Sequence, residues 1–84
     1  MAIVVLTPEA ADELEGLGNP IHGRMLKLLV RLEHWPEVSG AKSLVGALAR
    51  HYRLRTGDYR VQFRAAGDKV VVEKIGHRDR FYED

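Results

Sequence analysis

The chain of 84 residues contains no cysteine, which excludes disulfides, zinc–thiolate sites and cysteine nucleophiles. No apolar run approaches the roughly 20 residues that cross a membrane. No basic segment precedes an apolar run at the N-terminus, as a signal peptide would require. These absences predict a cytoplasmic protein without a membrane anchor. The length predicts a single small domain over residues 1–84, with no room for a second core.

Several classes of catalytic site also lack their residues. The histidines at positions 22, 34, 51 and 77 include no i, i+4 pair of the kind that binds metal on a helix. Ser39 and Ser43 lie outside any G-x-S-x-G setting, and no glycine-rich loop opens a helix to hold a phosphate. We therefore expect neither a metal site nor a small-molecule cofactor.

The segment from Arg50 to Arg64, RHYRLRTGDYRVQFR, is the most informative part of the chain. Its residues alternate between apolar and basic, and successive residues of a strand point to opposite faces of a sheet. The short break at Thr56-Gly57-Asp58 predicts the turn of a β-hairpin. One face of this hairpin would be apolar, and arginines at 53, 55, 60 and 64 would crowd the other. A polyanion such as RNA would relieve their mutual repulsion.

Charge is distributed unevenly along the chain. Residues 1–49 carry four Lys/Arg and six Asp/Glu, whereas residues 50–82 carry nine and four. Arginine outnumbers lysine nine to four. A GC-rich genome would explain the total, but not the clustering. Planar guanidinium groups suit phosphate contacts better than point charges do.

The remaining pattern predicts an α+β fold. Strand signals occupy residues 3–6, 50–64 and 69–75, and helix signals occupy residues 8–17 and 21–32. Gly76 is predicted to end the last strand, and residues 77–82 form a polar tail. Residues 36–49 are predicted to be a loop. The order indicates a mostly antiparallel four-stranded sheet with an N-terminal strand and a helical hairpin packed on one face. The other face would be open and basic.

RNA cleavage needs few groups beyond those in this basic region. The 2′-hydroxyl of RNA is the nucleophile, so the protein must supply a base, an acid and positive charge around the phosphate. Arginines, one histidine and one tyrosine suffice. The candidates are Arg53, Arg55, Arg60, Arg64, His77, Arg78, Arg80 and Tyr82.

Simpler interpretations compete with these roles. Arg53 and Arg55 could be solvated strand residues, and Arg64, far along the hairpin, is more typical of a surface residue than of a site. Arg80 is best explained by pairing with a nearby acidic residue, while His77 could cap the last strand and Tyr82 could anchor the C-terminus. The joint pattern is harder to explain in this way than any single member.

The motifs Tyr52-Arg53-Leu54-Arg55, Gly57-Asp58-Tyr59-Arg60-Val61 and Ile75-Gly76-His77-Arg78, with Tyr82, closely resemble the RelE/ParE superfamily of bacterial toxins. The resemblance covers the whole chain in order. It implies a RelE-like domain and a toxin of a type II toxin–antitoxin system. RelE-like members are mRNA interferases that cut mRNA on the ribosome. ParE-like members inhibit DNA gyrase.

By this resemblance, the positions that serve catalysis in RelE-like enzymes match Arg53, Arg55, Arg60, Arg78 and Tyr82. We expect Arg60, Arg78 and Tyr82, together with His77, to act in catalysis, and Arg53, Arg55 and Arg64 mainly to bind RNA. Arg53 and Arg55 stand where members often have lysine, and His77 stands where some have another basic residue. The primary interpretation is a ribosome-dependent, metal-independent endoribonuclease, a hydrolase in the broad sense. The alternatives are a ParE-like gyrase inhibitor, which binds protein without nuclease activity, and an inactive RNA-binding relative.

An antitoxin partner is expected on physical grounds as well as by resemblance. An open basic face and a small apolar groove beside the sheet are a liability in a free protein. An acidic, disordered segment that folds on binding could cover the face and neutralise its arginines. The expected partners are therefore a cognate antitoxin, the ribosome and mRNA.

Overall fold

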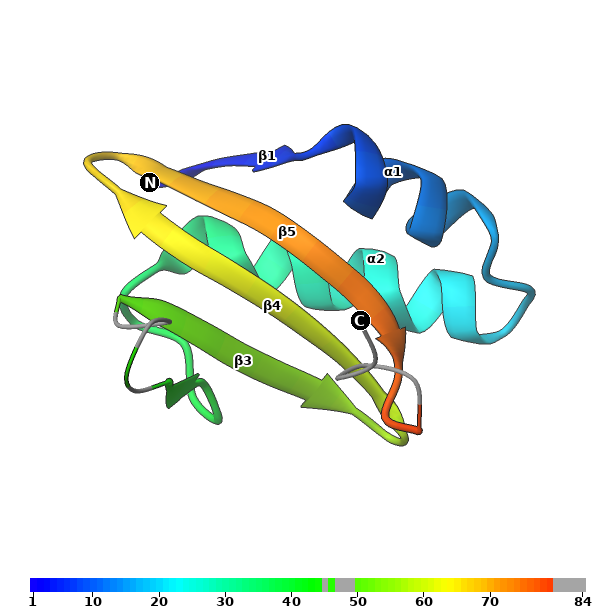
Figure 1. The fold of residues 1–84 in the computed structure, drawn as a ribbon. Helices are drawn as coiled ribbons and strands as arrows, with labels where there is room; N and C mark the ends of the chain where they lie inside the picture. Colours follow the sequence, from blue (N-terminus) through cyan, green and yellow to red (C-terminus); the bar gives the residue numbers. More distant parts are fainter. Residues whose placement is uncertain (45, 47–49, 80–84) are drawn as a thin grey trace.

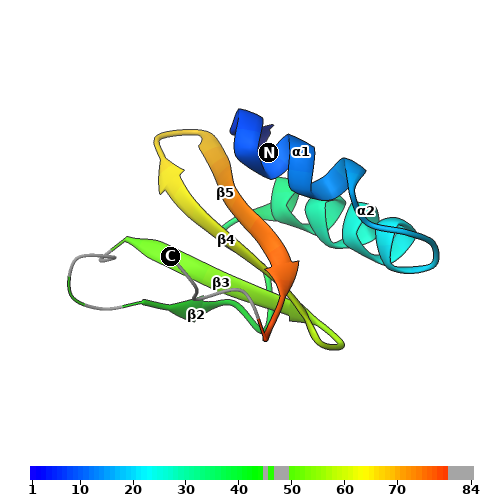
Figure 2. The same ribbon diagram turned by 45° about the vertical axis from the view of Figure 1, so that its right-hand side comes forward.

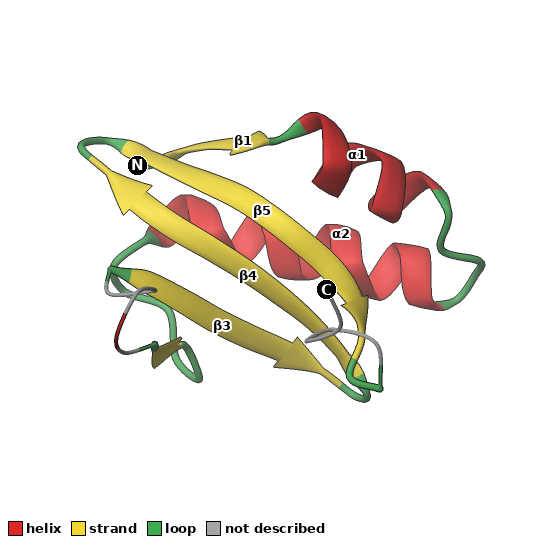
Figure 3. Cartoon of the chain, in the orientation of Figure 1, coloured by secondary structure: helices red, strands yellow, loops and turns green. Residues whose placement is uncertain are grey.

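The computed structural model describes residues 1–44, 46 and 50–79. In chain order the elements are β1 (Ile3–Leu6), α1 (Pro8–Glu15), α2 (Ile21–Arg31), the 3₁₀ helix η1 (Leu32–His34), β2 (Lys42–Ser43), β3 (His51–Thr56), β4 (Tyr59–Ala66) and β5 (Lys69–His77). The strands form a sheet in the order β1-β5-β4-β3-β2, and only the β1–β5 pair is parallel among these described strands. Both α-helices lie on the same side of this sheet (Figure 3), which confirms the predicted α+β fold.

The two helices are explained by their local sequence. Thr7 is the N-cap of α1, since its hydroxyl accepts a hydrogen bond from the Ala10 N–H at 3.1 Å, and Pro8 takes the first helical position. Helix α2 and the adjoining η1 bury Met25, Leu28, Leu29 and Leu32, whose i, i+3, i+4, i+7 spacing forms one stripe. None of the described helices is long and apolar enough to cross a bilayer.

The core lies between these helices and the sheet. Leu54, Val61 and Phe63 from the β3–β4 hairpin are buried. Val70, Val72 and Ile75 from β5 are buried beside them. These side chains meet the helical stripe, so the opposite face of the sheet is left uncovered; Figure 2 shows the helices on one side of the strands only.

Helix α1 completes the edge of β5 beyond the end of β1 (Figure 1). Strand β1 pairs with β5 only as far as Leu6 opposite Val72. Beyond that point the Thr7 N–H donates to the Val72 carbonyl at 2.9 Å, and the Ile75 N–H donates to Oε1 of Glu13 at 2.8 Å. Polar groups of α1 and its cap therefore replace a neighbouring strand.

Two boundaries differ from the sequence prediction. The sheet has a fifth strand because Lys42 and Ser43, within the predicted loop, pair with Arg53 and Tyr52 of β3. Two residues are too few to show a strand period. Gly76 does not end the last strand: it pairs with Arg60, and His77 pairs with Tyr59, because β4 offers partners to its first residue.

Candidate nucleic-acid interface

The predicted separation of apolar and basic residues in the β3–β4 hairpin is confirmed. Leu54, Val61 and Phe63 point into the core. Since strand residues alternate between faces, Arg53, Arg55, Arg60, Gln62 and Arg64 lie on the uncovered side of the sheet. We call this side the open face. The turn between the strands contains Gly57, whose φ of 58° favours glycine.

Strand register arranges the open face in rows that run across the sheet. The turn row, nearest the β3–β4 turn, contains Arg55 opposite Arg60, with Gly76 beside them on β5. The middle row crosses four strands and consists of Lys42, Arg53, Gln62 and Lys74. The distal row begins with His51 opposite Arg64. Lys42 and Lys74 were not among the predicted site residues, because only the register places them in line with Arg53.

The turn row contains two arginines with no carboxylate partner among the described residues. Arg55 and Arg60 are direct cross-strand neighbours, and like charges in such positions destabilise a sheet. The Nε atom of Arg60 is buried and makes no hydrogen bond to any described residue. A buried unpaired donor beside a second guanidinium is a site that an anionic oxygen would stabilise.

Arg78 lies at the same end of the sheet as the turn row. Its backbone N–H donates to the Asp58 carbonyl in the β3–β4 turn at 2.8 Å. Its Nε atom lies 3.9 Å from Oδ1 of Asp58 and 3.7 Å from Oδ1 of Asp79, and the side chain is 58% exposed. Exposed pairs of this length contribute little energy, so Arg78 is available to a phosphate.

His77 is not brought onto the open face. It is the direct partner of Tyr59, which lies on the helix side of the sheet, and the two rings meet edge to face at 5.1 Å. Its Nδ1 atom accepts a hydrogen bond from the Asp79 N–H at 3.1 Å. The structure therefore brings Arg55, Arg60 and Arg78 to one end of the sheet and turns His77 to the other side. Tyr82 and Arg80 lie outside the described residues.

The distal row is anionic as well as cationic. Glu73 of β5 lies beside His51 and Arg64, with Oε1 3.1 Å from Nε2 of His51 and Oε2 3.3 Å from Nε of Arg64. The sequence prediction did not include Glu73, because it considered basic and proton-transferring side chains only. Alternation from the buried Val70 and Val72 places Glu73 on the open face, and a bulge in β5 keeps Lys74 on that face as well.

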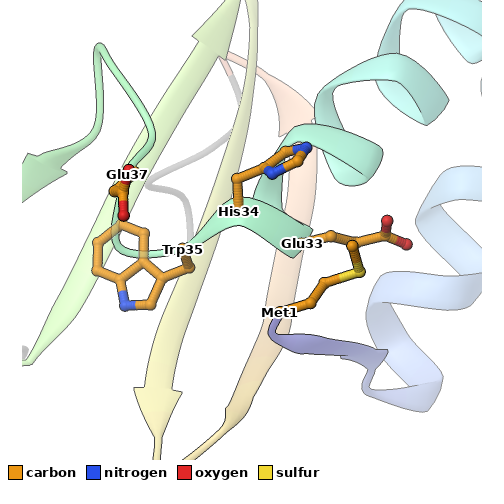
Figure 4. Close-up of a pocket in the computed structure, with 5 residues that line it drawn as sticks. All are labelled: Met1, Glu33, His34, Trp35 and Glu37. Carbon is orange, nitrogen blue, oxygen red and sulfur yellow. The ribbon is translucent and has the colours of Figure 1, made fainter.

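Two further observations concern parts of the described chain outside the open face. No group of three or more His, Asp and Glu side chains is placed to hold a metal ion in the described residues. A hollow of about 430 Å³ is lined by Met1, Glu33, His34, Trp35 and Glu37. Figure 4 shows Glu33, His34, Trp35 and Glu37 spread along η1 and the segment after it, with Met1 near Glu33, and these side chains do not converge on a common point. None of the basic residues of the open face lines this hollow.

Comparisons with known proteins agree with the fold. A family model described as the ParE toxin of the type II toxin–antitoxin system parDE matches residues 4–82. The crystal structure of the toxin–antitoxin complex RelBE2 from Mycobacterium tuberculosis is similar with a TM-score of 0.79 and 24% identity, over 92% of this chain and 98% of that chain. The isolated RelE toxin of E. coli gives a TM-score of 0.78 and 20% identity, over 92% and 84% of the two chains.

An archaeal RelE–RelB complex from Pyrococcus horikoshii gives a TM-score of 0.74 and 24% identity, over 94% of this chain and 97% of that chain. A comparison with curated proteins finds no significant match. At these identities the structural neighbours establish a shared fold, and the family model establishes the family.

Proposed function

The protein is a toxin of a type II toxin–antitoxin system and belongs to the ParE toxin family within the RelE/ParE superfamily, and we propose that it acts as a ribosome-dependent endoribonuclease that cleaves mRNA without a metal ion. The observation that carries this proposal is the unpaired turn row, Arg55 and Arg60, with Arg78 at the same end of the sheet. Three guanidinium groups in this region suit a phosphate that gains charge during reaction.

The proposed reaction is a phosphoryl transfer within the RNA. The 2′-hydroxyl oxygen attacks the adjacent phosphorus, the bond from phosphorus to the 5′ oxygen breaks, and a cyclic phosphate and a 5′-hydroxyl result. Arg60 and Arg78 stabilise the charge on the phosphate oxygens. Arg53 and Arg55 hold the strand in place through phosphate contacts.

The base is assigned by resemblance. We propose Tyr82 as the base that takes the proton of the 2′-hydroxyl, and His77 as an acid or a positioning group. Because His77 lies on the helix side beside Tyr59, it can act only at the edge of the sheet, where RNA would pass beyond the turn row. A positioning role agrees better with this placement than direct contact with a phosphate held by Arg60.

The test is cleavage of mRNA on translating ribosomes, followed by toeprinting. Arg60→Ala and Arg78→Ala should each slow the single-turnover rate by roughly 10²–10³, as expected for loss of one contact to transition-state charge. The matched control is Arg24→Ala, which removes an exposed arginine from α2 on the other side of the sheet and should cleave normally. Normal cleavage by the Arg60/Arg78 double variant would refute the assignment.

A second candidate function is inhibition of DNA gyrase. The observation in its favour is the match of the family model to ParE toxins. A gyrase supercoiling assay with the same protein preparation distinguishes the two functions. If the protein inhibits supercoiling and leaves ribosome-bound mRNA intact, the nuclease proposal is wrong.

We further propose a cognate antitoxin as the partner in the cell. Structural neighbours include toxins crystallised with their antitoxins, and the open face supplies charge for an acidic segment. An adjacent small gene that encodes a DNA-binding half and an acidic tail would supply a candidate. Co-expression of that protein should suppress toxicity, and paired Arg→Glu changes at Arg53 and Arg55 should weaken the complex.

A further inference from the structure

The rows of the open face differ in how their charge is compensated. In the turn row, Arg55 and Arg60 have no ionic partner among the described residues. In the distal row, Arg64 and His51 both lie against the carboxylate of Glu73. The basic face therefore ends on one side in uncompensated positive charge and on the other in a charge-balanced cluster.

Glu73 and Lys74 both lie on the open face because β5 is bulged. Gln62 pairs with Lys74 and Phe63 pairs with Val72, which leaves Glu73 as the extra residue. Val72 and Ile75, on either side of the bulge, are both buried, so the two residues between them project to the open side.

The bulge is held from the helix layer. The Thr7 hydroxyl donates to the Glu73 carbonyl at 3.4 Å. Two residues later, the Ile75 N–H donates to the side chain of Glu13 in α1 at 2.8 Å. These contacts hold the backbone of β5 at Glu73 and Ile75, and they do not depend on the charge of the Glu73 carboxylate.

The cluster is partly shielded from water. The side chain of Glu73 is 27% exposed and that of Arg64 is 43% exposed. Oε1 of Glu73 is buried and, although Nε2 of His51 lies 3.1 Å away, it makes no hydrogen bond of good geometry within the described chain. A phosphate that approached Arg64 would have to displace this carboxylate or lie beside it, and either arrangement costs energy through repulsion of like charges.

We propose that Glu73 sets the limit of the RNA-binding track on the open face. Phosphates contact the turn row and its neighbours, and the track stops before Arg64, whose charge Glu73 neutralises. Glu73 is thus a residue that determines where on the sheet the RNA backbone lies. The inference rests on the proposed RNA-binding function, and it revises the sequence-based expectation that Arg64 binds RNA.

The experiment measures binding of a short single-stranded RNA by fluorescence anisotropy across a series of salt concentrations at one pH. For single strands, each phosphate that the protein neutralises adds about 0.7 to the steepness of log K against log salt. Arg55→Gln should make the slope shallower by about 0.7. Arg64→Gln in the wild-type background should leave the slope unchanged.

Glu73→Gln keeps the size of the side chain and removes its charge. This variant should bind RNA more tightly at low salt, with a slope steeper by about 0.7, because Arg64 becomes available. Adding Arg64→Gln to Glu73→Gln should return the slope to the wild-type value. A purely structural role for Glu73 would change thermal stability and leave the salt slope as it was.

Each outcome separates the two proposals. If Arg64→Gln and Arg55→Gln make the slope of log K against log salt shallower by the same amount, the proposed limit of the RNA-binding track at Glu73 is wrong, although RNA binding itself is supported. An unchanged slope for folded Glu73→Gln leads to the same conclusion. If Glu73→Gln does not fold, the comparison of Arg64→Gln with Arg55→Gln decides alone. Absence of any salt-dependent RNA binding by the wild-type protein overturns the proposed function and this inference together.

Discussion

Replacing Arg60 with methionine should make the free protein more stable and destroy its proposed activity. The Arg60 guanidinium faces Arg55 directly across the strand pair, and its Nε atom is buried without a hydrogen-bond partner among the described residues. Methionine keeps an unbranched apolar stem and removes both the repulsion and the unpaired donor.

The expected gain has two parts. An unsatisfied buried polar atom costs about 1–3 kcal/mol. Nε is only one of the three nitrogens of the Arg60 guanidinium, so we take the lower end of this range for Arg60. Relief of a like-charged cross-strand pair adds about 0.2–1 kcal/mol. We expect Arg60→Met to raise the free energy of unfolding by about 1–2 kcal/mol. In a domain of this size, each kcal/mol of added stability raises Tm by roughly 4–8 °C.

The matched control is Arg55→Met. Arg55 is exposed, so its replacement should relieve only the repulsion and raise stability by about 0.5 kcal/mol. Urea unfolding at low and high salt separates the two parts, since salt screens the repulsion and not the desolvation. The gain of Arg55→Met should vanish at high salt, whereas that of Arg60→Met should persist in part. A less stable Arg60→Met protein, or equal gains for both variants, would refute the reasoning.

Three further predictions concern the strand charges, the tail and the core. Replacing both Arg53 and Arg55 with lysine should weaken cleavage without abolishing it, because lysine keeps the charge and loses the planar fork. Replacing both with glutamate should abolish ribosome binding, as measured by co-sedimentation. Unchanged binding of the Glu variant would disprove a role for these charges. Tyr82→Phe should sharply lower the single-turnover cleavage rate with little change in ribosome affinity if the hydroxyl moves a proton, whereas near-normal rates would indicate stacking on a base. Phe63→Ala should lower the free energy of unfolding, measured by urea titration, by about 3–5 kcal/mol, because the ring is fully buried against Trp35 and Tyr52. A loss below about 1 kcal/mol would contradict the central place of Phe63 in the core.

The hairpin and its open basic face could be predicted from the sequence because both depend on local rules. Alternation assigns Leu54 and Val61 to the core and Arg53 and Arg55 to the other side, whatever packs against them. The glycine at 57 sets the turn, and the turn sets the register that opposes Arg55 to Arg60. These residues are the part of the candidate site that the sequence alone determines.

The rest depended on contacts between segments distant in the chain. The bulge that places both Glu73 and Lys74 on the open face lies where β5 pairs with β4 on one side and accepts contacts from Thr7 and Glu13 on the other. Strand β2 pairs with the edge of β3 that β4 leaves free. His77 lies on the helix side because β5 continues two pairs beyond Ile75, so that His77 pairs with Tyr59. A period of two along one strand carries no information about a neighbouring strand or helix. Local alternation therefore determined which basic residues of the hairpin lie on the open face, and tertiary pairing alone decided which of them keep their charge uncompensated.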